Sequence, residues 1–174
     1  MQDLICSYQR VLSRLGGLDL IPSEWLHLTM QGVGFTDEVS SGDLSKIVDS
    51  AVRRLETIPP ACLTFGPATI RTEAIVLPPT PAGDVRAIRT QIRAAIGDVW
   101  GHDSIPEPAD RYEPHLSLAY VNTPQQSQPI ADALARVAVE AVTVTIDTAP
   151  LIVLRRDEHL YCWETFATVP LRGS

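Results

Sequence analysis

The spacing of hydrophobic residues along the chain switches repeatedly between helical and strand periods. Apolar residues recur every three or four positions in four segments, which we expect to be helices: residues 4–15, 43–55, 84–100 and 126–139. Asp43 is the expected N-cap of the second of these helices. Shorter apolar or alternating runs predict strands at residues 25–30, 63–71, 73–77, 112–121, 141–147, 149–155 and 159–169.

The order of these elements is nearly the same in the two halves of the chain. Each half reads helix, strand, helix and then two or three strands. This order predicts an α+β fold with two pseudo-symmetric lobes, each a small, mainly antiparallel sheet backed by helices. No flexible linker interrupts the pattern, so residues 1–174 are expected to form a single two-lobed domain.

Composition narrows the classes of partner. The formal net charge is −7 at pH 7, which argues against a general duplex-DNA or membrane-surface binder, because both need a dense cationic face. The apolar runs are too short to span a bilayer, and no signal peptide is recognisable. The three cysteines form no C-x-x-C pair, and we expect a cytoplasmic protein.

Two of the four histidines occur in matching contexts, LHLTM at 26–30 and PHLSL at 114–118. In a strand, alternate side chains share a face, so each motif presents an imidazole with a hydroxyl two residues later. His102 also has a hydroxyl two places on, but it lies in a turn-rich stretch, and His159 begins a predicted strand. Both are expected to be structural.

The repeated motif suits acid–base chemistry on a phosphate ester. An imidazole has a pKa near ~6.5 and can either take or give a proton at neutral pH. Two hydroxyls can hold the non-bridging oxygens on which charge develops. A lone strand histidine is more often a packed residue, so the case depends on the repetition. We expect no metal and no cofactor, because two histidines without a third ligand make a poor metal site.

The pattern resembles the two-histidine (2H) phosphoesterase superfamily, in particular its 2′-5′ RNA ligase-like proteins and cyclic phosphodiesterases. Members carry two His-x-Thr/Ser (HxTx) motifs on strands that face each other across a central cleft. The resemblance implies that His27 and His115 are the catalytic acid and base, and that Thr29 and Ser117 bind phosphate oxygens. By analogy His115 would be the base and His27 the acid, although the sequence leaves their order open.

Further residues are candidates for substrate binding: Trp25, Gln31 and Tyr112. Trp25 shares the face of His27 and could stack on a base or pack between the lobes, and Tyr112 could flank the cleft or cap its strand. Relatives often have a basic residue after each motif, where this chain has Gln31 and Tyr120. Relatives also usually begin with a strand, whereas this chain begins at a helix. We therefore expect a different phosphate affinity or preferred substrate. We also expect either a shortened start or a sheet edge that is completed differently, for example by a neighbouring molecule, because an unpaired edge strand favours association.

The resemblance implies a hydrolase that acts on a 2′,3′-cyclic phosphate at an RNA end or on a small cyclic nucleotide. The same residues would serve reversible 2′-5′ RNA ligation. Two alternatives remain: a non-catalytic nucleotide or phosphate-binding module of the same fold, and a structural partner that uses an open sheet edge. We expect a monomer, with association through that edge as the other possibility.

Overall fold

The computed structural model describes residues 1–157 and 160–173. The helices are α1 (Gln2–Leu12), η1 (Ser23–Trp25), α2 (Ser41–Leu55), α3 (Ala82–Trp100), η2 (His102–Ser104) and α4 (Gln128–Leu134), where η denotes a 3₁₀ turn. The strands are β1 (Leu18–Leu20), β2 (Ala61–Phe65), β3 (Thr69–Ile70), β4 (Ala74–Leu77), β5 (Pro79–Thr80), β6 (Leu116–Val121), β7 (Val142–Ile146), β8 (Thr148–Asp157) and β9 (Leu160–Pro170).

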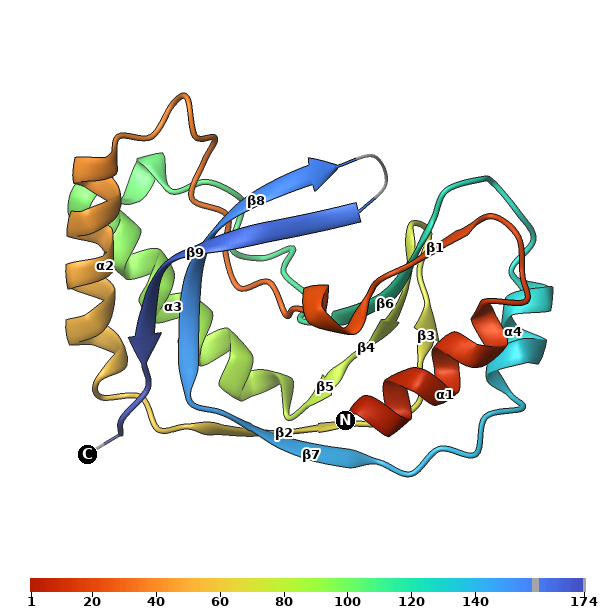
Figure 1. Ribbon diagram of the computed structural model, residues 1–174. Helices are drawn as coiled ribbons and strands as arrows, with labels where there is room; N and C mark the ends of the chain where they lie inside the picture. The colour runs from red at the N-terminus through yellow and green to blue at the C-terminus, as the bar shows by residue number, and fades with distance from the viewer. Residues whose placement is uncertain (158–159, 174) are drawn as a thin grey trace.

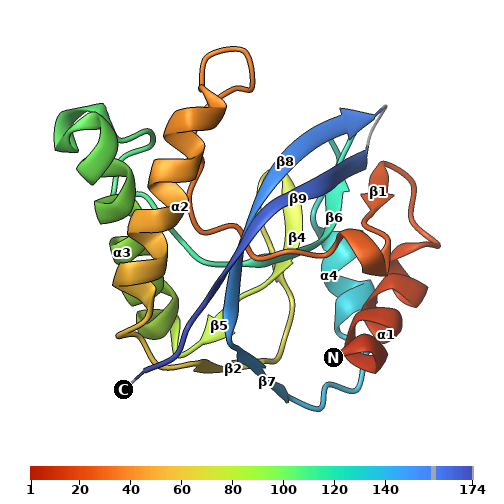
Figure 2. The ribbon, with the colours of Figure 1, turned by 60° about the vertical axis from the view of Figure 1, so that its left-hand side comes forward.

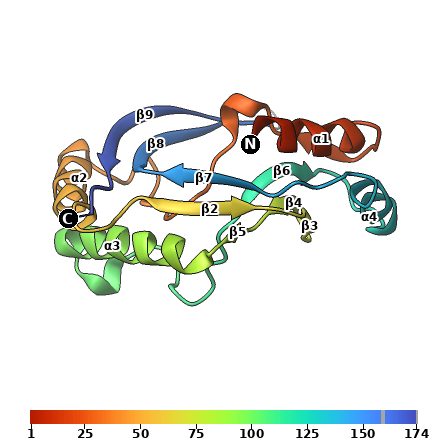
Figure 3. The ribbon, with the colours of Figure 1, turned by 90° about the horizontal axis from the view of Figure 1, so that it is seen from below.

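The strands form two antiparallel sheets and one long hairpin. One sheet has the order β1-β6-β4-β3, the other has the order β5-β2-β7, and β8 pairs with β9. Helices α1 and α4 lie together at one end of the molecule, and α2 and α3 lie together at the other (Figures 1 and 3). The predicted α+β fold with two lobes is confirmed. Each sheet takes strands from both halves of the chain, so the lobes do not follow one another in sequence.

The hairpin β8–β9 bridges the two ends. It runs from α2 across to the side where β1 and β6 lie (Figure 2). The apolar faces of the helices meet the sheets beneath it, and the largest fully buried side chains include Tyr8, Leu55, Phe65 and Leu118. Within the described residues, no helix combines the length and the apolar character that a membrane span requires.

The strand predicted at residues 25–30 is wrong. Its first residue, Trp25, closes the 3₁₀ turn η1, and only Leu28 makes a β-bridge, to Leu116. Two backbone carbonyls that could accept hydrogen bonds from a neighbouring strand accept them from side chains instead. Tyr112 Oη donates to Thr29 O at 2.8 Å, and Arg89 Nε donates to Met30 O at 2.9 Å.

Buried Arg89 is an anchor for this irregular segment. Its side chain also donates to the carbonyls of Pro108 and Ala109, at 3.3 and 3.2 Å, and its guanidinium lies 4.3 Å from the centre of the Tyr112 ring. One arginine therefore satisfies carbonyls from two loops, a task that suits the fixed fork of donors on its guanidinium. The backbone around Thr29 is held by side chains rather than by a sheet.

Other element boundaries differ from those predicted, for local reasons. The strand predicted from 112 begins at Leu116, because Pro114 lacks an N–H and the carbonyl of Glu113 is bonded to the His115 ring. The expected strand 63–71 divides into β2 and β3. The helix predicted over 126–139 is shorter, and β1 and β5 were not predicted. The predicted start of the last strand, residue 159, lies outside the described residues.

The N-cap of α2 is Ser40 and not Asp43. The Ser40 hydroxyl accepts a hydrogen bond from the Asp43 backbone N–H at 3.0 Å. Asp43 instead lies in the first turn, where a carboxylate interacts favourably with the helix dipole, and it pairs with Lys46 at 3.1 Å. The sequence signal for a helix start was correct, but Ser40, three residues earlier, fills the capping position.

Helices α2 and α3 are joined by a polar cluster centred on Asp98. Its carboxylate accepts from the Arg54 guanidinium at 2.7 and 2.8 Å and from the Ser50 hydroxyl. These hydrogen bonds, first those of Arg54 and then that of Ser50, hold the pKa of Asp98 well below its ordinary 3.8. A carboxyl pKa that is lower in the folded than in the unfolded protein stabilises the fold at pH values above the unfolded-state pKa. This stabilisation is lost as the pH falls from there through the folded-state pKa.

We therefore expect Asp98→Asn to lower the thermal midpoint at pH 7, with a smaller loss as the pH is taken progressively below 3.8. Thermal unfolding followed by circular dichroism across this pH range measures the difference. The matched control is Asp49→Asn, an exposed position on α2, which should leave the midpoint nearly unchanged. An equal loss for Asp98→Asn at all pH values would contradict the ionic origin of the effect.

Candidate active site

A single β-bridge aligns the two histidine motifs. The segment that follows β1 and η1 continues along the edge of β6, and Leu28 pairs antiparallel with Leu116. Antiparallel register then sets His27 opposite Ser117, and Thr29 opposite His115. Leu28 and Leu116 pack into the core, so the residues on either side of them face the opposite way. The two motifs are related by a local two-fold arrangement.

All four predicted catalytic residues line one cavity of about 370 Å³. His27 and Thr29 come from the segment after η1, and His115 and Ser117 come from the neighbouring segment at the start of β6. The other lining residues come from the β3–β4 connection, the start of β4 and β6: Arg71, Thr72, Glu73, Ala74 and Tyr120. The structure thus brings the two motifs together, with their imidazoles and hydroxyls in a shared space.

The two imidazoles are anchored in the same way. His27 Nδ1 lies 2.9 Å from the carbonyl oxygen of Trp25, and His115 Nδ1 lies 2.8 Å from that of Glu113. A carbonyl can only accept, so Nδ1 carries the proton in both rings. In a neutral ring the other nitrogen, Nε2, then holds the free lone pair. This orientation leaves Nε2 of each histidine as the atom available for proton transfer.

Arg71 is a site residue that the sequence analysis missed. It sits in the turn between β3 and β4, where its backbone N–H donates to Ala74 O at 2.8 Å. One guanidinium nitrogen is 3.0 Å from a Glu113 carboxylate oxygen, and the other is 3.3 Å from His115 Nδ1. Because Nδ1 donates to the closer Glu113 carbonyl, the second guanidinium nitrogen keeps donor capacity for another acceptor. Arg71 is a cation placed directly at the histidine cavity.

Tyr120 completes the wall on the β6 side. Burial raises the pKa of its phenol above the ordinary value of 10.0, and a hydrogen bond with Ser117 acts in the opposite direction. The Tyr120 ring also packs edge-on against Tyr161 of β9, with the ring centres 5.5 Å apart. Tyr120 therefore contacts both the Ser117 hydroxyl, which is predicted to bind phosphate, and Tyr161 of the β8–β9 hairpin.

The three residues predicted to bind substrate lie outside this cavity. Tyr112 holds the Thr29 carbonyl, and burial raises its pKa to about 12, so its hydroxyl donates throughout the neutral range. Gln31 is engaged by its amide with the carbonyls of Gly32 and Pro106 and with Arg93. Trp25 packs edge-on against Trp163, with ring centres 5.0 Å apart, and Trp163 in turn contacts His27. All three support the motif backbone or the aromatic contacts around it.

The other histidines take no part in the cavity as far as the structure describes it. His102 lies on η2 beside Gly97 of α3, and His159 is outside the described residues. Among residues 1–157 and 160–173, no group of three or more His, Cys, Asp or Glu side chains is arranged to hold a metal ion.

Solved structures share this fold over nearly the whole chain. TT0787 of Thermus thermophilus has a TM-score of 0.76 at 16% identity, covering 99% of this chain and 94% of that one. A phosphoesterase has a TM-score of 0.66 at 12% identity, covering 96% of this chain and 92% of that one. E. coli LigT complexed with ATP has a TM-score of 0.63 at 14% identity, covering 98% and 92%.

Sequence comparison adds the family. No curated protein sequence matches the chain. The model of a family described as the 2′-5′ RNA ligase superfamily, however, matches residues 8–158. This match spans both histidine motifs. The chain therefore belongs to the 2′-5′ RNA ligase superfamily, within the two-histidine phosphoesterases.

Proposed function

We propose that this protein is a metal-independent phosphodiesterase that hydrolyses 2′,3′-cyclic phosphates at RNA ends or on small nucleotides. The observation that supports this proposal is the convergence of two Nδ1-anchored imidazoles and two hydroxyls on one cavity. An acid and a base that line one cavity suit displacement at phosphorus, in which one takes a proton from the attacking group and the other gives a proton to the leaving oxygen. The acidic protein would still attract a phosphate here, because Arg71 supplies a local cation.

In the proposed reaction His115 is the base and His27 is the acid. Nε2 of His115 takes a proton from water as the water oxygen bonds to phosphorus. The P–O bond to one ribose oxygen breaks, and that oxygen receives a proton from Nε2 of His27, which enters this step as the imidazolium with both ring nitrogens protonated. Thr29, Ser117 and Arg71 hold the non-bridging oxygens. The product is a ribose phosphomonoester with a free neighbouring hydroxyl. The same ring opening with a 5′-hydroxyl in place of water as the nucleophile, and the 3′-oxygen as the leaving group, would form a 2′-5′ linkage.

The proposed ligand class is a small nucleotide. E. coli LigT, which shares the fold, has been solved in complexes with ATP, 3′-AMP and NADP⁺. The cavity of about 370 Å³ suits one phosphate with its ribose better than a long duplex. A binding module without turnover is the second candidate, favoured by the absence of a basic residue directly after each motif, where Gln31 and Tyr120 stand.

Hydrolysis of 2′,3′-cyclic AMP tests this proposal directly. We expect conversion to a single adenosine monophosphate isomer, at the same rate with and without EDTA. Liquid chromatography measures the conversion. A complete loss of turnover with EDTA that returns with added metal would contradict the metal-independent mechanism. Calorimetric binding of 3′-AMP, without any product from cyclic AMP after long incubation, would instead establish the binding module.

A further inference from the structure

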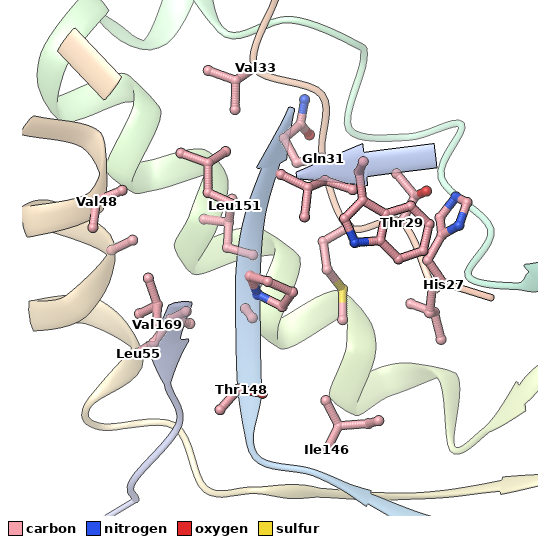
Figure 4. Close-up of a pocket in the computed structure, with 18 of the residues that line it drawn as sticks. His27, Thr29, Gln31, Val33, Val48, Leu55, Ile146, Thr148, Leu151 and Val169 are labelled. Atoms are coloured by element: carbon pink, nitrogen blue, oxygen red, sulfur yellow. The ribbon is translucent and has the colours of Figure 1, made fainter. Parts of the chain in front are cut away.

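A second cavity, of about 330 Å³, lies beside the histidine cavity and has the opposite character. Sixteen of its twenty lining residues are apolar, and the four polar ones are His27, Thr29, Gln31 and Thr148. Figure 4 shows Val48 and Leu55 of α2 on one side, Leu151 and Thr148 of β8 in the middle, and Thr29 and His27 at the other end. The cavity is a hydrophobic space between α2, the hairpin and the first histidine motif.

The two cavities share a wall. His27 and Thr29 line both of them, so the apolar space begins at the residues proposed to donate a proton and to bind phosphate. Trp163 also lines the apolar cavity, and its ring packs edge-on against His27 with the ring centres 5.1 Å apart. A molecule whose phosphate lies between the histidines can therefore extend a substituent past His27 into the apolar space.

The mouth of this cavity is accessible. Val33, Val48 and Leu151 are only half-buried although they are apolar, whereas Ile47, Ala51 and Leu55 form the buried floor. Open apolar spaces of this size are unfavourable for water, which needs two to four polar partners, and they bind apolar groups instead. A nucleobase would leave its polar edge poorly matched here, because the Gln31 amide is already engaged with carbonyls and Arg93.

We propose that the apolar cavity is a substrate subsite for a hydrocarbon substituent carried on the phosphodiester, close to the leaving oxygen. This inference rests on the proposed function and specifies its substrate class: cyclic phosphates of 1,2-diols that bear an alkyl chain. The bond changes are those already given. Water forms one P–O bond, the ring P–O bond breaks, and the freed diol oxygen takes a proton from His27. Only the group attached to the diol differs from a nucleotide.

The first test compares the cyclic phosphates of propane-1,2-diol and octane-1,2-diol, whose reacting rings are identical. Ring opening is followed by ³¹P NMR or chromatography. Each methylene buried in the cavity should lower KM about four-fold, so we expect a KM at least about ten-fold lower for the octane compound. Equal KM values for the two compounds would overturn the inference while leaving the proposed phosphodiesterase intact.

The second test fills the cavity. Val48→Trp should abolish most of the preference for the octane compound and leave kcat/KM for the propane compound nearly unchanged. Val52→Trp is the matched control, because Val52 lies one turn later on α2, is 39% exposed and does not line the cavity. Val48→Asp, with Val52→Asp as control, provides a smaller substitution should the tryptophan prevent folding. A chain-length preference that survives both changes at Val48 would overturn the inference.

A binding measurement separates this inference from the proposed function. If no cyclic phosphate is hydrolysed, the phosphodiesterase proposal fails, and calorimetry with octyl phosphate and methyl phosphate tests the subsite alone. Octyl phosphate binding at least about ten-fold tighter, with the difference lost in Val48→Trp and kept in Val52→Trp, supports the subsite. Equal affinities for the two phosphates would reject it.

Discussion

Alanine at either His27 or His115 is expected to lower turnover of 2′,3′-cyclic AMP by about 10²- to 10⁴-fold, the usual contribution of a positioned general acid or base. Each imidazole donates one Nδ1–H hydrogen bond to a carbonyl two residues earlier. Its loss removes a proton-transfer group, together with the edge-on contact to Trp163 in the case of His27 and the Arg71 contact in the case of His115. Circular dichroism of both variants should match the wild type. Initial rates under saturating substrate measure the effect.

The two variants should differ on a substrate whose leaving group needs no protonation. Bis(4-nitrophenyl) phosphate releases nitrophenolate, a stable anion, so His27→Ala should lose much less activity on it than on cyclic AMP. His115→Ala should lose its activity on both substrates, because water still needs a base. The reverse pattern would exchange the two roles. His102→Ala, outside the cavity, is the control and should retain full activity.

Arg71→Ala is expected to raise KM for cyclic AMP by about 10- to 100-fold, the range for a charge-assisted hydrogen bond to phosphate. Arg71→Lys keeps the charge but loses the planar fork, and should restore only part of the affinity. Arg155→Ala is the matched control. Like Arg71, Arg155 is paired with a glutamate, Glu164, at 3.1 Å, but it lines neither cavity.

Glu113 sharpens this test. Its carboxylate lies 3.0 Å from the Arg71 guanidinium, and its side chain is 71% exposed. Glu113→Gln removes a competitor for the guanidinium, so KM should stay the same or fall. If Arg71→Ala leaves KM unchanged, or if Glu113→Gln raises it as much as Arg71→Ala, the pair is structural and Arg71 does not bind phosphate.

The part of the candidate site that could be predicted from the sequence is the repeated pair of imidazole and hydroxyl residues. The spacing of imidazole and hydroxyl, with leucines between them, predicted which side chains share a face even though residues 25–30 are not a strand. Alternation survives because the segment remains extended around Leu28. The element order similarly predicted the fold class, since apolar periodicity is a local property.

What sequence reasoning missed depends on tertiary contacts. Arg71 reaches the cavity only because β3 and β4 form a tight hairpin beside β6, and no local pattern singles it out among the thirteen arginines. Tyr112 and Gln31 do not line the histidine cavity, and their polar atoms are bonded to the Thr29 carbonyl and to the loop around Pro106. A polar residue near a motif in sequence can serve its backbone instead of its ligand.

Because two of the sheets combine strands from both halves of the chain, the two histidine motifs do not belong to two independent folding units. The sheet that carries the motifs needs β1, β3 and β4 from the first half of the chain and β6 from the second, and the other sheet pairs β2 with β7. Neither half of the polypeptide alone contains all the strands of either of these two sheets, whereas the β8–β9 hairpin lies wholly in the second half. A fragment that holds only one histidine motif should therefore not fold its sheet by itself. Two fragments split between the motifs would form the site only by associating with each other.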